Sequence, residues 1–147
     1  MSGKVQPDER GDYLHFRVIT TRWMDNDVYG HVNNVVYYSY FDTVVSQYLV
    51  EFGALNIETS EQVGYVVETQ CRFFSPLSFP SIITAGLRVG HIGTSSVRYE
   101  IGIFRDDETI ASAQGHFVHV YVDRRSAKPL PLSPALRRLV SRLQVLA

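Results

Sequence analysis

The segment from Asp25 to Phe52 reads DNDVYGHVNNVVYYSYFDTVVSQYLVEF and decides how the chain folds. In its second part, apolar residues recur at the spacing of one face of an α-helix. These residues are Tyr37, Tyr40, Phe41, Val44, Val45, Tyr48 and Phe52. We predict a helix that begins at Asn33 or Asn34, where Asn is a good N-cap, and ends at about Glu51 or Phe52, before Gly53. Valine and the aromatic residues are weak helix formers, so packing must hold this helix.

The sequence around this helix has the features of β-strands. Before it, residues 13–23 are rich in β-branched and aromatic side chains. After it, the apolar period becomes two, and we expect Tyr65, Val67, Thr69, Cys71 and Phe73 to share one face of a strand. Three more strands are predicted in residues 83–89, 97–103 and 110–122.

Short connections separate the later strands. Gly90–Gly93 predicts a break or bulge, Arg105–Glu108 a hairpin turn, and Gly115 a bulge or a close backbone approach. Ser133 and Pro134 form a typical N-cap and first position of a second, C-terminal helix. Because hairpins connect antiparallel strands, we predict an α+β fold. A bent antiparallel sheet of about five strands wraps around one long central helix, with a short C-terminal helix added.

Composition places the chain among ordinary globular proteins. It has 147 residues and 16.7 kDa, 45% hydrophobic and 20% charged residues, and a net charge of −1. This balance argues against disorder and against a dedicated nucleic-acid binder. We expect a flexible N-terminal arm in residues 1–11 and a single domain in residues 12–147. Residues 121–147 carry six basic side chains against Asp123 alone, which fits either a solvated helix or a small anion site.

The compartment is predicted from cysteine usage and from the lack of targeting signals. Cys71 is the single cysteine, so no intramolecular disulfide can form, and its strand context favours a buried, inert thiol. We see neither a signal peptide nor an apolar run long enough for a membrane span. A reducing cytoplasm is the expected location.

The first part of the quoted segment, Asp25–Asn34, combines three features that suit acyl hydrolysis. Asp25 and Asp27 lie on a turn, and Gly30 allows the backbone close to a ligand. The first N–H groups of the following helix lack intrahelical partners and suit a developing oxyanion. A carboxylate beside them can act as a base on water or as a nucleophile. On physical grounds alone, the same residues also fit a plain helix cap.

The pattern DxDxxGHVNNxxYxxYFD, from Asp25 to Asp42, resembles the hotdog-fold acyl-CoA thioesterases of the 4-hydroxybenzoyl-CoA thioesterase type. The resemblance extends over nearly the whole chain. It implies that Asp27 is the catalytic carboxylate, that backbone N–H groups at Asn34 and Asn33 polarise the thioester carbonyl, and that His31 lies beside them. It also implies a homodimer with one continuous sheet and two interface sites, and further pairing to a homotetramer.

The other two acids of the pattern carry different expectations. Asp25 is interpreted as a capping carboxylate that orders the turn. Asp42 is a candidate catalytic acid, because related hotdog enzymes of another lineage carry one on the central helix. The family usually follows this acid with Ala-Arg, whereas this chain has Thr43, Val44 and Val45. Asp42 is therefore either catalytic or a structural or interface acid.

Substrate-binding candidates follow from the same resemblance. Tyr37 and Phe73 are expected to line the acyl pocket, and Ser96, Arg124 and Arg125, with Arg72 and Arg88, are candidates for holding coenzyme A (CoA). No cofactor is expected, since CoA is part of the substrate. No metal site is expected either, because His116 and His119 point to opposite faces of one strand.

Three functions are compared. The first is hydrolysis of an acyl-CoA to the free acid and CoA. The second is a hotdog protein that binds acyl-CoA or lipid without turning it over. The third is a hydratase or dehydratase, which needs an acid–His pair at a spacing that Asp27 and His31 do not match. The expected partners are thus an acyl-CoA and further copies of the chain, with no nucleic acid and no membrane.

Overall fold

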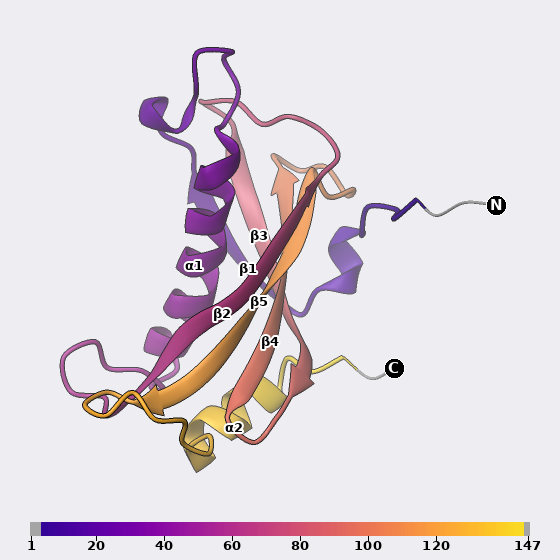
Figure 1. Ribbon diagram of the computed structural model, residues 1–147. Helices are drawn as coiled ribbons and strands as arrows, with labels where there is room; N and C mark the ends of the chain where they lie inside the picture. Colours follow the sequence, from indigo (N-terminus) through magenta and orange to yellow (C-terminus); the bar gives the residue numbers. More distant parts are fainter. Residues whose placement is uncertain (1–3, 146–147) are drawn as a thin grey trace.

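The structure, a computed structural model, describes residues 4–145 of the chain (Figure 1). The first three residues of the expected arm and the last two of the expected domain lie outside this range. The main elements are β1 (His15–Thr20), α1 (Asn34–Glu51), β2 (Gln62–Phe73), β3 (Ile82–Ile92), β4 (Ser96–Arg105), β5 (Ala113–Asp123) and α2 (Pro134–Ser141). Short 3₁₀ turns occupy Arg10–Asp12 and Trp23–Asp25.

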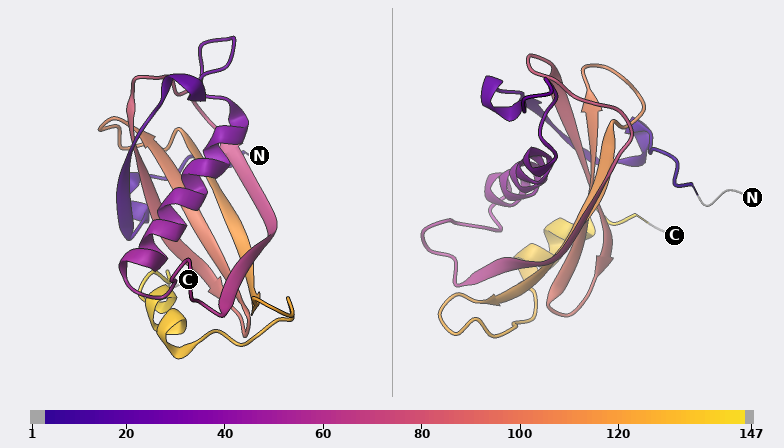
Figure 2. Two further views of the ribbon diagram at one scale, coloured as in Figure 1. Left: turned by 90° about the vertical axis from the view of Figure 1, so that its left-hand side faces the viewer. Right: turned by 45° about the horizontal axis from the view of Figure 1, so that its top comes forward.

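The five strands form one antiparallel sheet in the order β1-β3-β4-β5-β2. The sheet is strongly bent, and α1 lies along its concave face, as the right-hand view of Figure 2 shows. The N-terminal segment lies on the opposite, convex side (Figure 2). This arrangement confirms the predicted α+β hotdog fold, including the short C-terminal helix.

Helix α1 forms where its sequence predicts it. Asn33 is the N-cap, and its side-chain oxygen accepts the N–H of Val35 at 3.3 Å. The predicted apolar face is buried with one exception, since Phe52 is 48% exposed at the C-cap and Leu49 is buried instead. Phe52 lies beyond the last turn, where it packs on the ring of Tyr48 at 5.0 Å rather than entering the core. Gly53 follows with φ +82°, a conformation that glycine adopts without strain.

Strand β2 departs from the predicted pattern. Its register against β5 shifts between Val66 and Glu68, so a bulge interrupts the alternation of side chains. Tyr65 pairs with Val120, whereas Thr69 pairs with Phe117, three residues earlier on β5. Tyr65 therefore lies on the opposite face from Thr69, Cys71 and Phe73, and the expectation of one shared face is wrong. The period-two pattern contained no sign of the extra residue.

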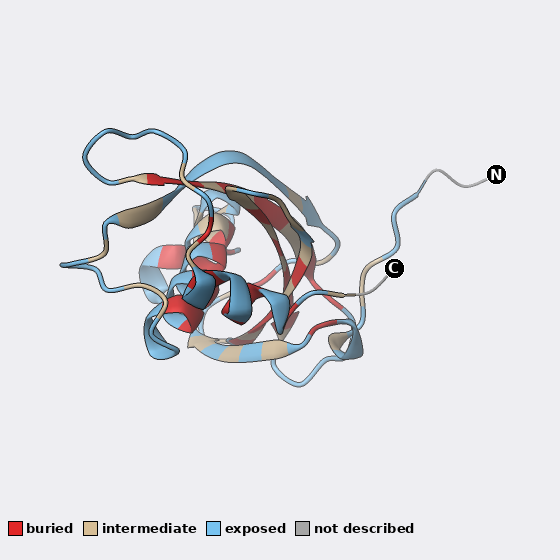
Figure 3. Cartoon of the chain, turned by 90° about the horizontal axis from the view of Figure 1, so that it is seen from below, coloured by how far each residue is buried: buried red, intermediate tan, exposed pale blue. Residues whose placement is uncertain are grey.

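β2 is also the outer strand of the sheet on the side of β5. It is exposed along most of its length, in contrast to the buried strands β3 and β4 (Figure 3). Exposed apolar side chains on it include Tyr65, Val66 and Val67. A long, apolar and unpaired edge is a ready template for pairing with another strand.

Two glycines occupy places in the sheet where the sequence predicted an irregularity or a close approach. A side chain at Gly115 would collide with the backbone of Gln70 and Cys71 on β2 and with the Phe41 ring on α1. This confirms the close backbone approach that was predicted at Gly115. At Gly90 the register of β3 against β4 shifts, which confirms the bulge expected there.

Part of the segment that was expected as a flexible arm bonds to the sheet. The Asp8 N–H donates to the side-chain oxygen of Gln114, and the Asp8 carbonyl accepts the Ala111 N–H at 2.9 Å. Arg10 donates side-chain N–H groups to the carbonyls of Asp106 and Glu108. These contacts extend from the turn after β4 to the start of β5.

The close approach at Gly115 gives a stability prediction. Gly115→Ala should lower the free energy of unfolding by about 3 kcal/mol, the upper end for overpacking, because the added carbon meets backbone that cannot move aside. Urea unfolding followed by circular dichroism measures the loss. Gly11→Ala is the matched control, since nothing lies within 4 Å of a side chain there. Equal stability of the two variants would contradict the packing described.

Candidate active site

A short hairpin-like turn connects β1 to α1. Asn26 and Val32 form an isolated antiparallel bridge. Within it, the Gly30 N–H donates to the Asp27 carbonyl at 3.0 Å, and the Asp27 N–H donates to the His31 carbonyl at 2.8 Å. Gly30 has φ +81°, and a side chain there would be strained. The turn therefore has a defined shape, and it needs glycine at this position.

Asp25 anchors the turn to the helix. Its buried carboxylate accepts the Arg22 backbone N–H at 2.9 Å, two N–H groups of the Arg22 guanidinium, and the Tyr40 hydroxyl at 2.7 Å. Burial by itself raises the pKa of Asp25, but the hydrogen bonds from Arg22 and Tyr40 outweigh it and hold the pKa below its usual range. The Asp25 carbonyl also accepts the Asn33 N–H at 2.8 Å, so this N–H does not face a ligand, contrary to the expectation that it polarises the thioester carbonyl. These bonds agree with the interpretation of Asp25 as an ordering carboxylate.

Asp27 lies on the outer side of the turn and is partly exposed. One carboxylate oxygen accepts the Tyr29 N–H at 2.9 Å, and the other has no hydrogen-bond partner within residues 4–145. Asp27 lines a hollow with Trp23, Met24 and Val28, three apolar side chains that are each more than 70% exposed. The carboxylate thus has one oxygen that can act on a ligand in an apolar setting.

The start of α1 lies on the other side of the turn. The Asn34 N–H has no acceptor in the described part of the chain, since the Asn33 side chain caps Val35. His31 and Asn34 are exposed and line a second hollow with Tyr37, Phe73 and Phe74. An unpaired N–H at a helix N-terminus can donate a hydrogen bond to a ligand atom that carries a partial negative charge.

The structure brings Asp27, His31, Asn33 and Asn34 to one end of the molecule, but Asp27 and Asn34 line different hollows. Gly30 lines the hollow of Asp27, and nothing lies within 4 Å of the position of a side chain there.

Tyr37 and Phe73 meet as the acyl-pocket expectation requires. Their rings contact edge to face, with centroids 4.9 Å apart, and both line the second hollow. Burial raises the pKa of Tyr37 to about 12, so its hydroxyl stays protonated at neutral pH. Tyr37 can shape a pocket or donate a hydrogen bond, but it is not suited to act as a base.

Asp42 lies apart from both hollows. It is exposed on α1, one helical turn beyond Tyr38, and partial burial raises its pKa above the usual range. Among residues 4–145, no side chain donates a hydrogen bond to it. In a single chain, Asp42 does not join Asp27 and Asn34.

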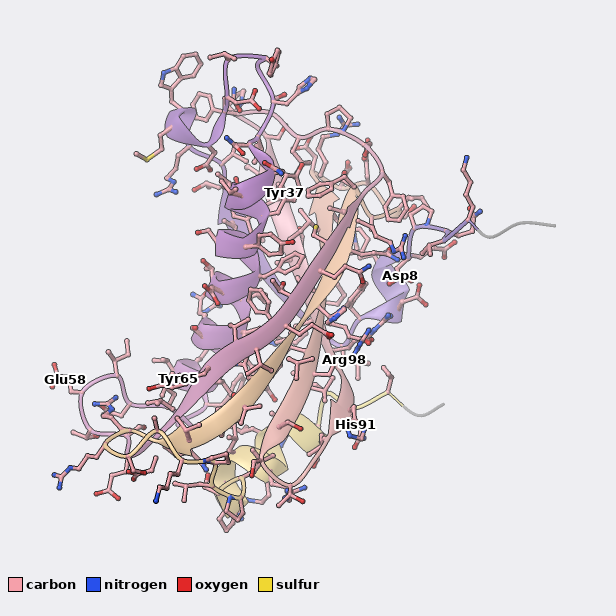
Figure 4. All side chains as sticks on the ribbon, in the orientation of Figure 1. Asp8, Tyr37, Glu58, Tyr65, His91 and Arg98 are labelled. Carbon is pink, nitrogen blue, oxygen red and sulfur yellow. The ribbon has the colours of Figure 1, made fainter. Side chains whose placement is uncertain are left out.

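The CoA candidates Ser96, Arg124 and Arg125 lie at the opposite end of the sheet. Figure 4 shows Tyr37 near one end of β2 and Glu58 and Tyr65 near the other. Arg124 donates its guanidinium N–H groups to the carbonyls of Ile57 and Glu58, at 2.9 and 3.1 Å, which ties it to the loop before β2. Ser96 begins β4, and Arg125 belongs to the turn after β5.

Some residues of the site were not predicted from the sequence. Tyr40 had been assigned only to the apolar face of the helix, and its bond to Asp25 spans 15 residues. Ser78 also belongs here, because its hydroxyl donates to the Gly30 carbonyl at 2.9 Å. The DxD spacing followed by an aromatic helix face is the one sequence signal that could have pointed to the Asp25–Tyr40 pair.

Within residues 4–145, no group of three or more His, Cys, Asp or Glu side chains is placed to hold a metal ion. His116 contacts Glu68 on the convex face at 2.9 Å, while His119 is buried with its ring beside Tyr99. No helix in the described range is long and apolar enough to cross a membrane.

The chain is similar to known proteins over most of its length. The thioesterase-like superfamily matches residues 21–140. The PA5185 protein of Pseudomonas aeruginosa is 49% identical, with a TM-score of 0.93, over 96% of this chain and 99% of that one. The PA2801 protein of the same organism, a proposed thioesterase, is 26% identical with a TM-score of 0.79, over 87% and 98%.

A more distant solved structure, the 1,4-dihydroxy-2-naphthoyl-CoA thioesterase from Synechocystis, is 14% identical over 86% of this chain and 94% of that one. Its TM-score of 0.78 shows a shared fold. No curated protein matches the chain.

The anchoring of Asp25 gives a second prediction. Tyr40→Phe should lower the free energy of unfolding by about 1.5–3 kcal/mol at neutral pH, because a buried carboxylate loses a donor. The lowered pKa of Asp25 contributes stability that is lost as the pH falls through the folded-state value. Loss of the Tyr40 hydroxyl raises that folded-state pKa, so acid unfolding should begin at a higher pH.

Thermal melts between pH 3 and pH 7 measure this shift. Tyr48→Phe is the matched control, since it also removes a buried hydroxyl, but one that donates to the neutral carbonyl of Leu139. We expect Tyr48→Phe to lower stability without moving the acid limb. An identical acid limb in wild type and Tyr40→Phe would show that Tyr40 does not act on Asp25.

Proposed function

Because this chain belongs to the thioesterase-like superfamily, we propose that it is an acyl-CoA thioesterase, which hydrolyses an acyl-CoA to the free acid and CoA. The observation that carries the proposal is the pairing of two unsatisfied groups across one turn. Asp27 offers a carboxylate oxygen without a partner, and Asn34 offers an N–H without an acceptor. Only the segment 28–33 separates them in sequence, and no side chain fills the space at Gly30.

In the proposed reaction, the thioester carbonyl oxygen accepts the Asn34 N–H, with His31 and Asn33 beside it. Asp27 takes a proton from water while the water oxygen bonds to the carbonyl carbon. The resulting oxyanion is stabilised by the helix N-terminus. When the carbonyl re-forms, the carbon–sulfur bond breaks, and the CoA thiolate takes up a proton. The products are a carboxylic acid and free CoA, and no cofactor takes part.

A second route uses the same residues. The free Asp27 oxygen attacks the carbonyl carbon directly, which gives a mixed anhydride and releases CoA. Water then hydrolyses the anhydride and regenerates the carboxylate. Both routes need Asp27 in its ionised form.

The edge of β2 supports a homodimer. Two copies that pair their exposed β2 strands antiparallel would join two sheets into one and cover Tyr65, Val66 and Val67. Such pairing brings the Ser96, Arg124 and Arg125 end of one copy towards the Asn34 end of the other. These residues can therefore act only on a substrate bound by the partner. A tetramer would be built from two such dimers.

The alternatives are weaker on this geometry. A hydratase needs an acid–His pair at a different spacing from that of Asp27 and His31, which are separated by three residues in a glycine turn. A protein that binds acyl-CoA without hydrolysis would not need the free carboxylate oxygen of Asp27. Kinetics on a panel of acyl-CoAs separates binding from turnover.

The catalytic role of Asp27 gives a third prediction. Asp27→Asn should lower kcat by about 10²–10⁴-fold, because positioned base catalysis is lost. The amide oxygen can still accept the Tyr29 N–H, so the turn and the fold should persist. Release of free thiol from short, long, branched and aryl acyl-CoAs measures the loss and the acyl preference together.

The matched variant is Asp42→Asn, a carboxylate on α1 that lines neither hollow. We expect Asp42→Asn to retain most of the wild-type kcat. Full activity of Asp27→Asn with collapse of Asp42→Asn would instead favour a mechanism based on the helix acid. Full activity of both variants would remove both carboxylates from the chemistry.

The dimer gives a fourth prediction. Light scattering should give a mass of twice 16.7 kDa or a multiple of it for the wild type. Val67→Lys places a charge on the exposed edge and should shift the mass towards the monomer, since like charges then face each other across the dimer axis. Ile57→Lys, at an equally exposed loop position, is the control. A monomeric wild type would contradict the dimer.

A further inference from the structure

Three hollows adjoin one another around the C-terminal end of β2. The Asn34 hollow, at the start of α1, ends on Phe73 and Phe74. The N-terminal hollow runs between Lys4–Pro7 and β2, and it shares both phenylalanines. The arginine-lined cavity, of about 160 Å³ on the convex face, shares Val5 and Arg72 with the N-terminal hollow. Together they form a path from the helix N-terminus around the end of β2 to the other face of the sheet.

The wall of the arginine-lined cavity contains three arginines, from three different strands, and two carboxylates. Arg88 bridges Asp8 and Glu100, at 3.2 and 2.8 Å, and Arg98 donates its Nε–H to Glu100 at 2.8 Å. Hydrogen bonds from Arg88 and Arg98 lower the pKa of Glu100, despite its partial burial, so it stays ionised and balances part of this charge.

Arg72 is the arginine that this network leaves over. Within residues 4–145, its guanidinium has no hydrogen-bond or ion-pair partner. It lies on the convex face of β2, in register with Gln114, where the N-terminal hollow meets the arginine-lined cavity. Gln70, two residues earlier on the same face, adds an amide to the wall. The cavity therefore keeps an uncompensated positive charge at its mouth.

Distance separates Arg72 from the CoA candidates Arg124 and Arg125. Arg72 directly precedes Phe73, whose side chain lines the hollow at Asn34. Arg124 and Arg125 lie beyond the other end of β2, and twelve residues of strand span roughly 36 Å. The pantetheine chain of CoA is about as long as five peptide residues, or roughly 17 Å when extended. Within one protomer, a thioester held at Asn34 can place its phosphates near Arg72 but not near Arg125.

We propose that the phosphates of CoA bind at Arg72, at the mouth of the arginine-lined cavity on the convex face of the protomer whose helix α1 holds the thioester. The pantetheine chain then crosses Phe73 and Phe74 beside the N-terminal segment. The planar fork of a free guanidinium matches two phosphate oxygens. This inference rests on the proposed function, because it takes the substrate to be an acyl-CoA.

The test compares each acyl-CoA with the thioester of the same acid and pantetheine, which lacks the nucleotide and its phosphates. Arg72→Ala should raise KM for the acyl-CoA by about 10–100-fold, the loss expected for a charged hydrogen bond. It should leave kcat unchanged, and it should leave KM for the pantetheine thioester unchanged. Arg138→Ala, which removes an exposed basic side chain from α2, is the matched control and should alter neither substrate.

Two results would overturn the proposal. One is an unchanged KM for the acyl-CoA in Arg72→Ala, and a rise in Arg125→Ala would then assign the phosphates to the partner subunit's basic end. The other is an equal rise in KM for both substrates in Arg72→Ala.

Calorimetry with CoA itself separates this inference from the proposed function. If the wild type hydrolyses no thioester, the proposed function fails. CoA affinity that falls in Arg72→Ala but not in Arg138→Ala would still support the phosphate site, and equal affinities would refute it.

Discussion

The hydrogen bonds to the buried carboxylate of Asp25 hold the functional end of this molecule together. They connect the segment after β1, where Arg22 donates its backbone N–H, to helix α1, where Tyr40 donates its hydroxyl. The Asp25 carbonyl then receives the Asn33 N–H, which fixes the N-cap of the same helix. A buried charge is costly unless it is fully bonded, so the turn and the helix can be stable here only in one mutual arrangement.

That arrangement leaves two groups unsatisfied on either side of a glycine. Asp27 has one free oxygen, and the first N–H of α1 has no acceptor in the described part of the chain. Asp27 is partly exposed and Asn34 is exposed, so a ligand at this end of the molecule can bind these two groups in place of water. The exposed edge of β2 borders the same region through Phe73 and Phe74. Substrate binding and association of two copies are therefore expected to involve adjoining surfaces.

Much of the fold could be predicted from the sequence, because local patterns and packing agree there. The apolar period of α1, the Asn33 cap and the tight packing at Gly115 all depend on residues close in sequence or on a missing side chain. The bulge that turns Tyr65 to the opposite face was not visible, since one extra residue leaves the composition of a strand unchanged. The Asp25–Tyr40 bond and the position of Arg72 beside the N-terminal segment required the topology. The same holds for the CoA candidates, which the sequence listed together and the fold separates to two ends of β2.

The central claim is that one thioester lies across the turn between Asp27 and the Asn34 N–H. A crystal structure of Asp27→Asn with a bound acyl-CoA tests this most directly, because the substitution keeps the turn while slowing turnover. The account predicts the carbonyl oxygen at about 2.7–3.2 Å from the Asn34 backbone nitrogen, with the side chain at position 27 facing the carbonyl carbon. A thioester bound beside Asp42, or away from the start of α1, would contradict it.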